Sequence, residues 1–410
     1  MQTSITQPRT PDIEEADAIL RSCVHCGFCT ATCPTYQLLG SELDSPRGRI
    51  YLIKEMLETG KATGKTRLHL DRCLTCRSCE TTCPSGVRYG QLIDIGREIV
   101  EEKAPRPLVE KLFRRAMLVT IPHTARMSVA LSAARLIRPL LPKSLRSKIP
   151  ARQKTMPETA ATHKRRMLMP DGCVQPLTAP NTNLAAAAVL DRLGISLIKA
   201  SGCCGALNQH LSDPDGAKDM MRRNIDTWWP HIIDGIEAIA MTASGCGLMV
   251  KEYGALLKGD ADYAAKAARV SELAKDISEI IGRENIDSLS HAGHGMRVAY
   301  HSSCTSQHGQ KLSGKVEALL ARCGYELTPV ADSHLCCGAA GTYTLTQPEL
   351  SSQLLANKLA ALEANGPEVI ATANVGCQMH LASSTSLPVV HWIELLASSS
   401  NKPTIKEETV

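Results

Sequence analysis

The sequence is poor in aromatic residues, with 2 Phe, 3 Trp and 8 Tyr among 410 residues. It also lacks any uninterrupted apolar run of the roughly 18 residues that a membrane-spanning helix needs, so we expect any contact with a membrane to be peripheral or made through a partner. The first 20 residues show no cationic start followed by an apolar stretch and a small-residue cleavage site. We therefore expect no secretory signal and a reducing, cytoplasmic setting.

Motifs for organic cofactors and for nucleophilic catalysis are missing as well. No G-x-G-x-x-G follows a predicted strand, because Gly293-His-Gly295 continues as Met-Arg-Val. No G-x-S-x-G elbow or Ser/His/Asp grouping is present. The sequence therefore predicts no catalytic residues on this chain, and we expect any substrate chemistry to take place on a partner.

Acidic residues are nearly absent from one stretch. From Lys103 to Lys148 there are eleven Lys and Arg and one acid, Glu110, whereas the whole chain carries a net charge of +5. Prolines punctuate this stretch, and residues 125–141 have the spacing of an amphipathic helix. We interpret residues 101–165 as a basic linker with a surface helix. Anionic lipid and an acidic partner subunit explain the charge equally well, whereas nucleic acid is disfavoured because no aromatics are interleaved.

Cysteine is abundant, with 17 residues in uneven groups. Eight lie between Cys23 and Cys83, none in 84–172, and nine between Cys173 and Cys377. In a reducing setting such groups favour metal binding over disulfides. The first group is flanked by helical patterns at 13–22, 45–60 and 91–103, with Ser45 and Pro46 as a helix start and Gly60 as a helix stop.

Two runs in the first group share the spacing C-x2-C-x2-C-x3-C-P. This spacing lets three thiolates of one tight loop bind three irons of a 4Fe-4S cube, and in two-cluster ferredoxins the fourth cysteine ligates the other cluster. The predicted ligand sets are therefore Cys23, Cys26, Cys29 and Cys83 for cluster 1, and Cys73, Cys76, Cys79 and Cys33 for cluster 2.

Structural zinc is the alternative, because C-x2-C is also a zinc knuckle. Zinc takes four ligands from two separated pairs, however, and has no use for the third cysteine and the one before proline. Nearby Arg47 and Arg49 either offset cluster charge, bind a partner or are ordinary solvated helix residues.

The second cysteine group belongs to an internal repeat. RMLMPDGCVQ corresponds to RVAYHSSCTS, GCCGA to LCCGAAG, and TASGCG to TANVGC. Each half starts with a short strand-like run, at 167–169 and 298–300, and continues through a helical stretch, at 184–193 and 315–322. A second strand follows at 195–199 and 326–330. This order predicts two α/β units with parallel sheets that pack as pseudo-symmetric halves.

Eight cysteines recur at equivalent positions of the two halves. Adjacent cysteines do not easily form one disulfide, and the glycine after each pair, Gly205 or Gly338, permits close approach of the backbone to a bulky group. Cluster binding is favoured, and buried structural thiols are the alternative. The candidate ligands are Cys173, Cys203, Cys204, Cys246, Cys304, Cys336, Cys337 and Cys377. Cys323 lies outside the repeat and is expected in the core.

These motifs resemble CCG-domain proteins such as the heterodisulfide reductase subunit that binds iron-sulfur clusters through such domains. That family ends each motif in C-x2-C, whereas this chain has Cys246-Gly-Leu-Met249 and Cys377-Gln-Met-His380. The last cysteine is absent from both halves, which leaves His380 as a candidate substitute ligand.

Over roughly residues 15–396 the chain also resembles the iron-sulfur subunits of bacterial glycolate oxidase (glycolate dehydrogenase). RSCVHCGFCTATCPTYQLLGSELDSPRGRIYLIKEML, HLDRCLTCRSCETTCPSGVRYG, SHLCCGAAGTY and TANVGCQMHLAS carry the resemblance. It implies electron transfer from FAD on partner flavin subunits, in a hetero-oligomer that oxidises glycolate to glyoxylate and, as a candidate, D-lactate. The acceptor it implies is quinone-linked, at the cytoplasmic face of the inner membrane.

The expected fold class is α+β and multidomain. A helical ferredoxin-like domain with two 4Fe-4S clusters (15–100) precedes the linker (101–165) and two pseudo-repeated α/β CCG halves (166–290 and 291–400), in which a further iron-sulfur cluster is a candidate. The alternatives are a heterodisulfide-reductase-like enzyme, the iron-sulfur subunit of another 2-hydroxy-acid or glycerol-3-phosphate dehydrogenase, and a zinc-stabilised nucleic-acid-binding protein.

Overall fold

The computed structural model describes residues 1–140, 142, 146, 149–159, 162–290 and 292–397. They form two compact units, each built from separate stretches of chain. Unit 1 consists of Met1–Met117, Asn208–Pro214 and His334–Lys358. Unit 2 consists of Leu118–Leu207, Asp215–Ser333 and the described residues from Leu359 onward. The amino-terminal cysteine region therefore forms one unit with two much later segments, which the sequence did not indicate.

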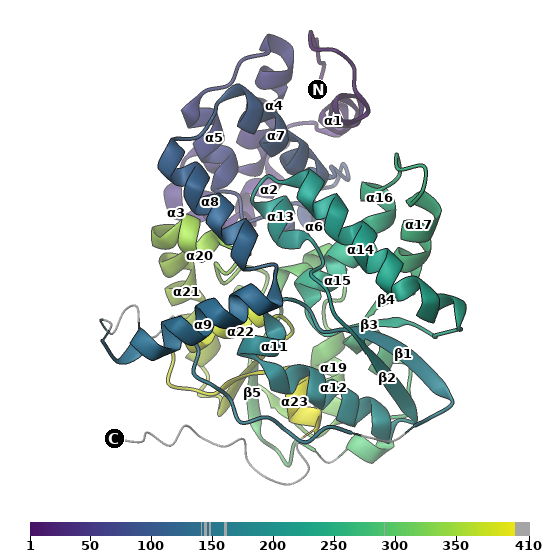
Figure 1. The fold of residues 1–410 in the computed structure, drawn as a ribbon. Helices are drawn as coiled ribbons and strands as arrows, with labels where there is room; N and C mark the ends of the chain where they lie inside the picture. Colours follow the sequence, from purple (N-terminus) through teal and green to yellow (C-terminus); the bar gives the residue numbers. More distant parts are fainter. Residues whose placement is uncertain (141, 143–145, 147–148, 160–161, 291, 398–410) are drawn as a thin grey trace. The chain divides into compact units, whose positions relative to one another are not determined.

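Unit 1 is helical throughout its described residues (Figure 1). Its elements are α1 (Pro11–Ser22), α2 (Phe28–Ala31), α3 (Pro34–Leu39), η1 (Glu42–Asp44), α4 (Pro46–Thr59), α5 (Gly64–Asp71), α6 (Ser78–Thr82), α7 (Tyr89–Lys103) and α20 (Tyr343–Thr346). Four helices continue from one unit into the other: α8 (Leu108–Thr120), α13 (Ala206–His210), α14 (Pro214–Ile233) and α21 (Pro348–Glu363).

Helix α4 shows how the sequence sets the local structure beside the cysteines. The Ser45 side chain accepts a hydrogen bond from the Gly48 amide at 3.0 Å, Pro46 occupies the first turn, and Gly60 ends the helix with a φ of 69°. These are the predicted start and stop signals. Ile53 of α4 and Leu92 of α7 are fully buried in one hydrophobic cluster with α1, so the helices form a rigid support for the loops between them.

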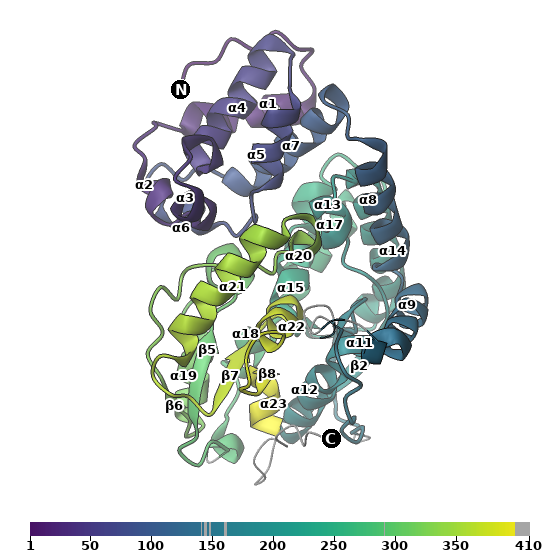
Figure 2. The same ribbon diagram turned by 90° about the vertical axis from the view of Figure 1, so that its left-hand side faces the viewer.

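Unit 2 contains two parallel sheets, each of four strands. The first is ordered β2-β1-β3-β4, from β1 (Arg165–Pro170), β2 (Ile195–Ala200), β3 (Ile239–Met241) and β4 (Ala274–Asp276). The second is ordered β6-β5-β7-β8, from β5 (Arg297–His301), β6 (Glu326–Leu327), β7 (Val369–Thr372) and β8 (Val389–His391); Figure 2 shows β5, β7 and β8 side by side. The identical strand order confirms the predicted repeat. Strand β6 is shorter than the run predicted at 326–330.

Helices and short turns complete both halves of unit 2. In the linker segment they are α9 (Thr124–Ile137) and η2 (Arg138–Leu140). In the first half they are α11 (Gln175–Thr178), α12 (Pro180–Arg192), α14 (Pro214–Ile233), α15 (Ser244–Lys251), α16 (Tyr253–Leu256), α17 (Ala264–Leu273) and α18 (Ile277–Ile281). Those that follow are η3 (Asp287–Leu289), η4 (Thr305–Gly309), α19 (Lys315–Arg322), α22 (Val375–Ala382) and α23 (Trp392–Ala397).

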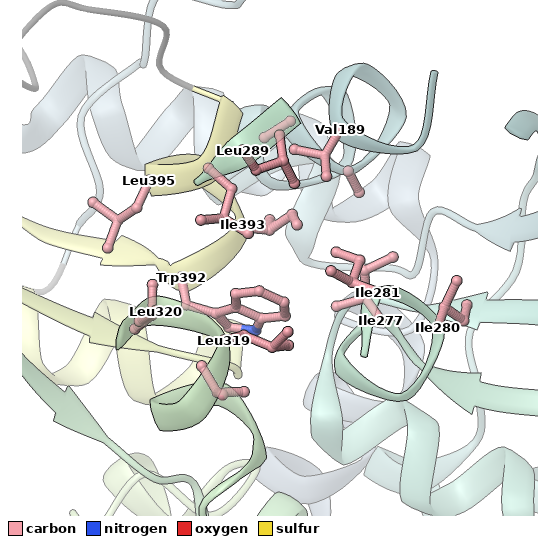
Figure 3. Close-up of a cluster of buried hydrophobic side chains, with 14 of the residues drawn as sticks. Val189, Ile277, Ile280, Ile281, Leu289, Leu319, Leu320, Trp392, Ile393 and Leu395 are labelled. Atoms are coloured by element: carbon pink, nitrogen blue, oxygen red, sulfur yellow. The ribbon is translucent and has the colours of Figure 1, made fainter. Parts of the chain in front are cut away.

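The two halves share one hydrophobic core (Figure 3). Val189 of α12 and Ile277 of α18 come from the first half, whereas Leu320 of α19 and Trp392 of α23 come from the second, and all four are fully buried. Cys323 belongs to the same core, as predicted. Because the halves bury apolar surface against each other, they hold the carboxyl ends of their strands in fixed positions.

Candidate iron-sulfur sites

The two cysteine runs adopt the same backbone conformation. Two positions of each loop have positive φ angles: His25 and Gly27 in the first loop, with φ of 57° and 86°, and Thr75 and Arg77 in the second, with φ of 51° and 60°. A short helix follows in each case, α2 or α6. The left-handed turns fold each loop tightly, so that its cysteines converge from a short stretch of chain.

Each loop lines a cavity that also receives the last cysteine of the other run. The first cavity is lined by Cys23, Cys26, Cys29 and Cys83. The second is lined by Cys33, Cys73, Cys76 and Cys79, and Cys79 also borders the first cavity. The structure thus brings together both predicted ligand sets, including the crossing of the fourth cysteines.

The lining of both cavities fits a cluster that is anionic and bound by sulfur. Neither cavity has a carboxylate among its described lining residues, whereas Arg47 borders the first cavity and Arg49 and Arg77 border the second. Burial raises the pKa of Cys29 to about 11 and the pKa of Cys79 well above its usual value. These thiols are neutral until a metal displaces their protons. Soft thiolate donors with nearby cations suit an iron-sulfur cluster.

Buried polar groups surround the second cavity. Arg49 is 1% exposed and donates to the Thr35 hydroxyl at 3.0 Å, and that hydroxyl lies 3.3 Å from Cys33 Sγ. The Tyr89 hydroxyl donates to Cys73 Sγ at 3.6 Å. Hydrogen bonds of this kind tune a cluster held by these sulfurs.

A second buried arginine reaches the same loop from α7. Arg97 is 5% exposed and donates to the Leu70 carbonyl at 3.0 Å, to the Cys73 carbonyl at 2.5 Å and to Thr75 Oγ1 at 2.9 Å. All three acceptors are neutral. Arg97 therefore brings a full positive charge to the second loop, and neither its spacing nor its sequence context indicated this role.

Residues of the second repeat motif also pack against the second loop within unit 1. Burial raises the pKa of Cys76 well above its usual value, and the nearby Cys336 thiol raises it further. The Tyr343 hydroxyl donates to the Arg72 carbonyl at 2.9 Å. Part of the LCCGAAGTY segment thus lies beside the predicted cluster 2 ligands, a proximity that sequence reasoning missed.

The four cysteines of the first repeat motif gather at one edge of the first sheet. Cys173 follows β1, Cys203 and Cys204 follow β2, and Cys246 lies in α15 after β3. These three strands are parallel neighbours, so their carboxyl ends meet at the same edge. Hydrogen bonds from Cys173 and Cys204 lower the pKa of Cys203, and hydrogen bonds to Cys203 and Cys246 raise the pKa of Cys204. All four predicted candidates are therefore brought together.

Side chains of the surrounding helices hold the Cys203-Cys204 backbone. Asn224 of α14 donates to the Cys203 carbonyl at 2.8 Å and to the Tyr253 hydroxyl at 2.9 Å. That hydroxyl in turn donates to the Cys204 carbonyl at 2.9 Å. The Tyr253 ring stacks on Trp228, with ring centroids 6.4 Å apart. The cysteine pair is thus fixed by buried, mutually satisfied groups.

The glycine after each cysteine pair has a packing role. Gly205 and Gly338 have φ angles of 89° and 92°. A Cβ at Gly205 would lie 3.0 Å from the Ala217 carbonyl oxygen, and one at Gly338 would lie 2.8 Å from the Ser351 carbonyl oxygen. The close approach is therefore to the backbone of α14 and α21, and this packing explains the glycines without a bulky bound group.

The second repeat motif is divided between the units. Cys336 and Cys337 belong to unit 1, whereas Cys304 and Cys377 belong to unit 2. In unit 2 the ligand atoms of Cys377 and His301 lie within 4.8 Å of each other, and both residues are buried. The sequence offered His380 as a substitute ligand and did not single out His301.

The fold and these sites define a class of iron-sulfur protein that joins a two-loop cysteine domain to a duplicated cysteine-rich α/β domain. Residues 19–87 match the family described as "4Fe-4S dicluster domain", and residues 167–251 and 298–382 match the CCG "Cysteine-rich domain". The predicted fold class, repeat and iron-sulfur cofactors are thereby confirmed. Within the described residues, every helix is too short or too polar to cross a bilayer.

The chain belongs to the family of glycolate oxidase iron-sulfur subunits. It is 55% identical over 407 residues to the glycolate oxidase iron-sulfur subunit of Escherichia coli (strain K12), which covers 98% of this chain and 100% of the relative. It is 30% identical over 427 residues to the probable glycolate oxidase iron-sulfur subunit of Bacillus subtilis (strain 168), with 94% and 95% covered. The predicted family resemblance is confirmed.

More distant similarities agree with this fold. Lactate utilization protein A of Bacillus licheniformis is 28% identical over 239 residues, which cover 55% of this chain and 96% of that relative. A solved structure, "Crystal structure of a hypothetical protein from Helicobacter pylori", has a TM-score of 0.59 at 10% identity and covers 97% of this chain and 74% of that one. At this identity the likeness concerns the fold alone.

Proposed function

We propose that this chain is the electron-transfer subunit of a glycolate dehydrogenase complex. A partner subunit with a flavin would oxidise glycolate to glyoxylate, with D-lactate as a second candidate substrate, and the electrons would go to a membrane acceptor such as a quinone. Two cavities, each lined by all four cysteines of one predicted set, carry this proposal, together with 55% identity to a glycolate oxidase iron-sulfur subunit. When bound, 4Fe-4S clusters supply one-electron transfer.

In this proposal the eight amino-terminal cysteines are the cluster ligands, in the two sets that line the cavities. The chain's own residues do three things there. The left-handed loops orient the thiolates, the buried helices α4 and α7 exclude water from the second set, and Arg49 and Arg97 supply positive charge beside it. The proposed ferredoxin-like domain, residues 15–100, is completed by the segment His334–Lys358.

The first repeat half offers a further cluster site. Cys173, Cys203, Cys204 and Cys246 are hydrogen-bonded to one another or in electrostatic contact. Four soft donors at one sheet edge fit a cluster better than they fit inert core thiols. We propose these four as its ligands in the first CCG half, residues 166–290. The second half, residues 291–400, has a different set of neighbours.

Reduction by substrate tests the electron-transfer role directly. The complex is purified anaerobically, and glycolate or D-lactate is added while flavin absorbance and iron-sulfur EPR signals are recorded. We expect flavin reduction to be followed by reduced-cluster signals. The matched variants Cys26→Ser and Cys76→Ser should each remove one cluster's signal while the partner flavin is still reduced. Reduced flavin beside oxidised clusters in the intact complex would contradict the proposal.

Helix α8 supports a peripheral membrane location because its apolar residues face outward and a charged residue faces the protein. Arg114 and Met117 face the protein, whereas Leu108, Val109, Leu112 and Phe113 are 71%, 80%, 58% and 47% exposed. Helices on protein surfaces normally turn their apolar residues inward. An apolar face of this kind marks a surface that is covered by something else.

Ion pairs fix this reversed orientation. Arg106, which precedes the helix, pairs with Asp71 at 2.6 Å, and Arg114 Nη2 lies 3.5 Å from the same carboxylate. Arg114 also pairs with Glu110 at 3.3 Å. These pairs use the acid of the basic stretch, Glu110, and two of its cations. Lys111 and Arg115 remain exposed beside the apolar face.

We propose that this face inserts into the headgroup region of an anionic bilayer. Apolar side chains flanked by Lys and Arg are typical of interfacial helices, and each cation near the surface is worth about 1 kcal/mol. In unit 2 the α9 region has a similar run, with Val129, Leu136, Ile137 and Leu140 exposed. A partner subunit that covers α8 is the alternative.

Vesicle flotation distinguishes the two candidates for what covers α8, an anionic bilayer and a partner subunit. The purified chain should float with phosphatidylglycerol-containing vesicles and much less with phosphatidylcholine vesicles. Leu112→Glu should reduce flotation at least tenfold, whereas Ile233→Glu, at a 72% exposed apolar position of α14, should not. A Leu112→Glu protein that floats normally but no longer co-purifies with flavin subunits would identify α8 as a subunit interface.

A further inference from the structure

The second half of the repeat contains a buried histidine with an unusual contact set. His301 is the last residue of β5 and is 2% exposed. Its carbonyl accepts a hydrogen bond from Thr372 Oγ1 at 3.0 Å, but its ring Nδ1 has no hydrogen-bond partner among the described residues. A ring nitrogen of His301 and Cys377 Sγ lie within 4.8 Å of each other.

A buried ring nitrogen without a hydrogen-bond partner destabilises the folded protein. The loss of hydration is not offset by a hydrogen bond within the fold. His391, at the end of β8, is equally buried but fully satisfied, because its Nε2 lies 2.8 Å from the Thr242 carbonyl and its Nδ1 accepts from the Ile393 amide at 3.2 Å. His391 has a structural role, whereas the Nδ1 of His301 is available to a ligand.

The repeat shows that His301 is an addition to the second half. In the correspondence of RMLMPDGCVQ with RVAYHSSCTS, His301 takes the place of Pro170, three residues before the first cysteine of its motif. Cys377 likewise corresponds to Cys246, which contacts Cys204 in the first half. At the equivalent sheet edge, the first half thus has thiols only, whereas the second half adds an imidazole beside its last cysteine.

We propose that His301 is a nitrogen ligand, with Cys377 as a thiolate ligand, of an iron-sulfur cluster in the second cysteine-rich half. The proposal rests on the iron-sulfur role put forward above. Imidazole and thiolate together are a known donor set for such clusters, and a neutral imidazole in place of an anionic thiolate raises the reduction potential. The two halves would then hold chemically different sites.

Pulsed EPR on the intact, anaerobically purified chain tests this ligand. After partial reduction, hyperfine coupling to a directly bound nitrogen is expected in the wild type, and its pattern should change when the histidines are labelled with nitrogen-15. His301→Ala should abolish the coupling and lower the iron and sulfide content by that of one cluster. His301→Cys should keep the iron, lose the coupling and lower the potential of that site.

The matched control is His391→Gln, which alters a histidine of equal burial in the same sheet. It should reduce thermal stability but leave both the coupling and the iron content unchanged. Coupling that persists in His301→Ala, iron content equal to that of the wild type, or zinc in place of iron and sulfide would each overturn the proposal. A third outcome is that the double variant Cys26→Ser/Cys76→Ser loses all clusters while His301→Ala keeps them all. The electron-transfer role would then stand, and only the ligand role of His301 would be rejected.

Discussion

The two cysteine loops of unit 1 share a backbone but differ in their surroundings. The tip of the first loop exposes Val24 and Phe28, and its neighbour Arg47 lies at the surface, paired with Glu42. The second loop has Leu74 and Cys79 buried, with Arg49 and Arg97 buried beside it. Equal spacing therefore gives equal loops, whereas the residues that pack around them decide how a bound cluster behaves.

This difference predicts unequal reduction potentials. Burial alone disfavours the more negative reduced state, but a buried cation opposes that effect. A unit charge about 6 Å away at an effective dielectric constant of about 20 is worth roughly 3 kcal/mol. Arg49 is paired with the buried Asp44, but Arg97 donates to neutral acceptors. Its charge outweighs that of the half-exposed Arg47, which is paired with Glu42, so we expect the cluster held by the second loop to have the higher potential.

Removing one ligand from each loop should have the largest effect. Cys26→Ser, at the exposed first loop, should remove about four iron atoms and leave the fold intact. Cys79→Ser should remove at least as many and also destabilise unit 1, because Cys79 borders both cavities and packs in the core. Iron and sulfide analysis with thermal unfolding checks both, with Cys323→Ala as the control. Equal stability of the two ligand variants would contradict the difference in burial.

Removing one arginine from beside each loop should have a smaller effect, on the reduction potentials of the two clusters. Arg97→Gln should lower the potential of the second-loop cluster by roughly 100 mV, since 59 mV corresponds to a tenfold change for one electron. Arg47→Gln should change the first-loop potential much less, because Arg47 is half-exposed, paired with Glu42 and screened by solvent. EPR-monitored redox titration of both variants measures the two shifts. Similar shifts in the two variants would mean that burial of the arginine is unimportant.

Acid should destabilise the surroundings of the second loop. Burial, with Arg97 and Arg77 nearby, lowers the pKa of His210 from its usual 6.5 to about 4. The unfolded chain therefore binds a proton first as the pH falls, so stability is lost between about pH 6.5 and 4, by roughly 1 kcal/mol at pH 5.5. His210→Gln should flatten this pH dependence in urea unfolding. A slope unchanged by the substitution would rule out His210 as its source.

The smallest expected effect comes from one hydrogen bond. Tyr89→Phe removes the donor to Cys73 Sγ. A neutral hydrogen bond is worth about 1 kcal/mol, so the second-loop potential should fall by roughly 20–40 mV. The same redox titration detects this shift, and Tyr51→Phe, at an exposed position of α4, provides the control.

Spacing and periodicity predicted the parts of the fold that depend on local chain geometry. The two tight cysteine loops, the cap residues of α4 and the two parallel sheets with one strand order all follow from patterns within short segments. The repeat also placed Cys173, Cys203, Cys204 and Cys246 at strand ends. Local structure can be predicted from the sequence because φ preferences and the alternation of side chains along a strand leave the backbone few conformations.

Features that depend on distant packing were beyond the sequence. Arg97 reaches the second loop from α7, and Tyr343 reaches it from a segment some 270 residues later. The apolar face of α8 turns outward because Arg106 and Arg114 pair with Asp71. The net charge of the basic stretch did not indicate these ion pairs. His301 could have been noticed as the one histidine aligned with a proline of the first half, but only the fold places it beside Cys377.

The discontinuity of unit 1 affects how the protein matures on the ribosome. Both cysteine loops emerge early in translation, yet the segment His334–Lys358 that completes their unit is among the last to be made. At about 5–20 residues per second, the wait is on the order of tens of seconds. During that interval the contacts that Cys336 and Tyr343 make with the second loop are absent, so the loop stays uncovered until the later segment has been made.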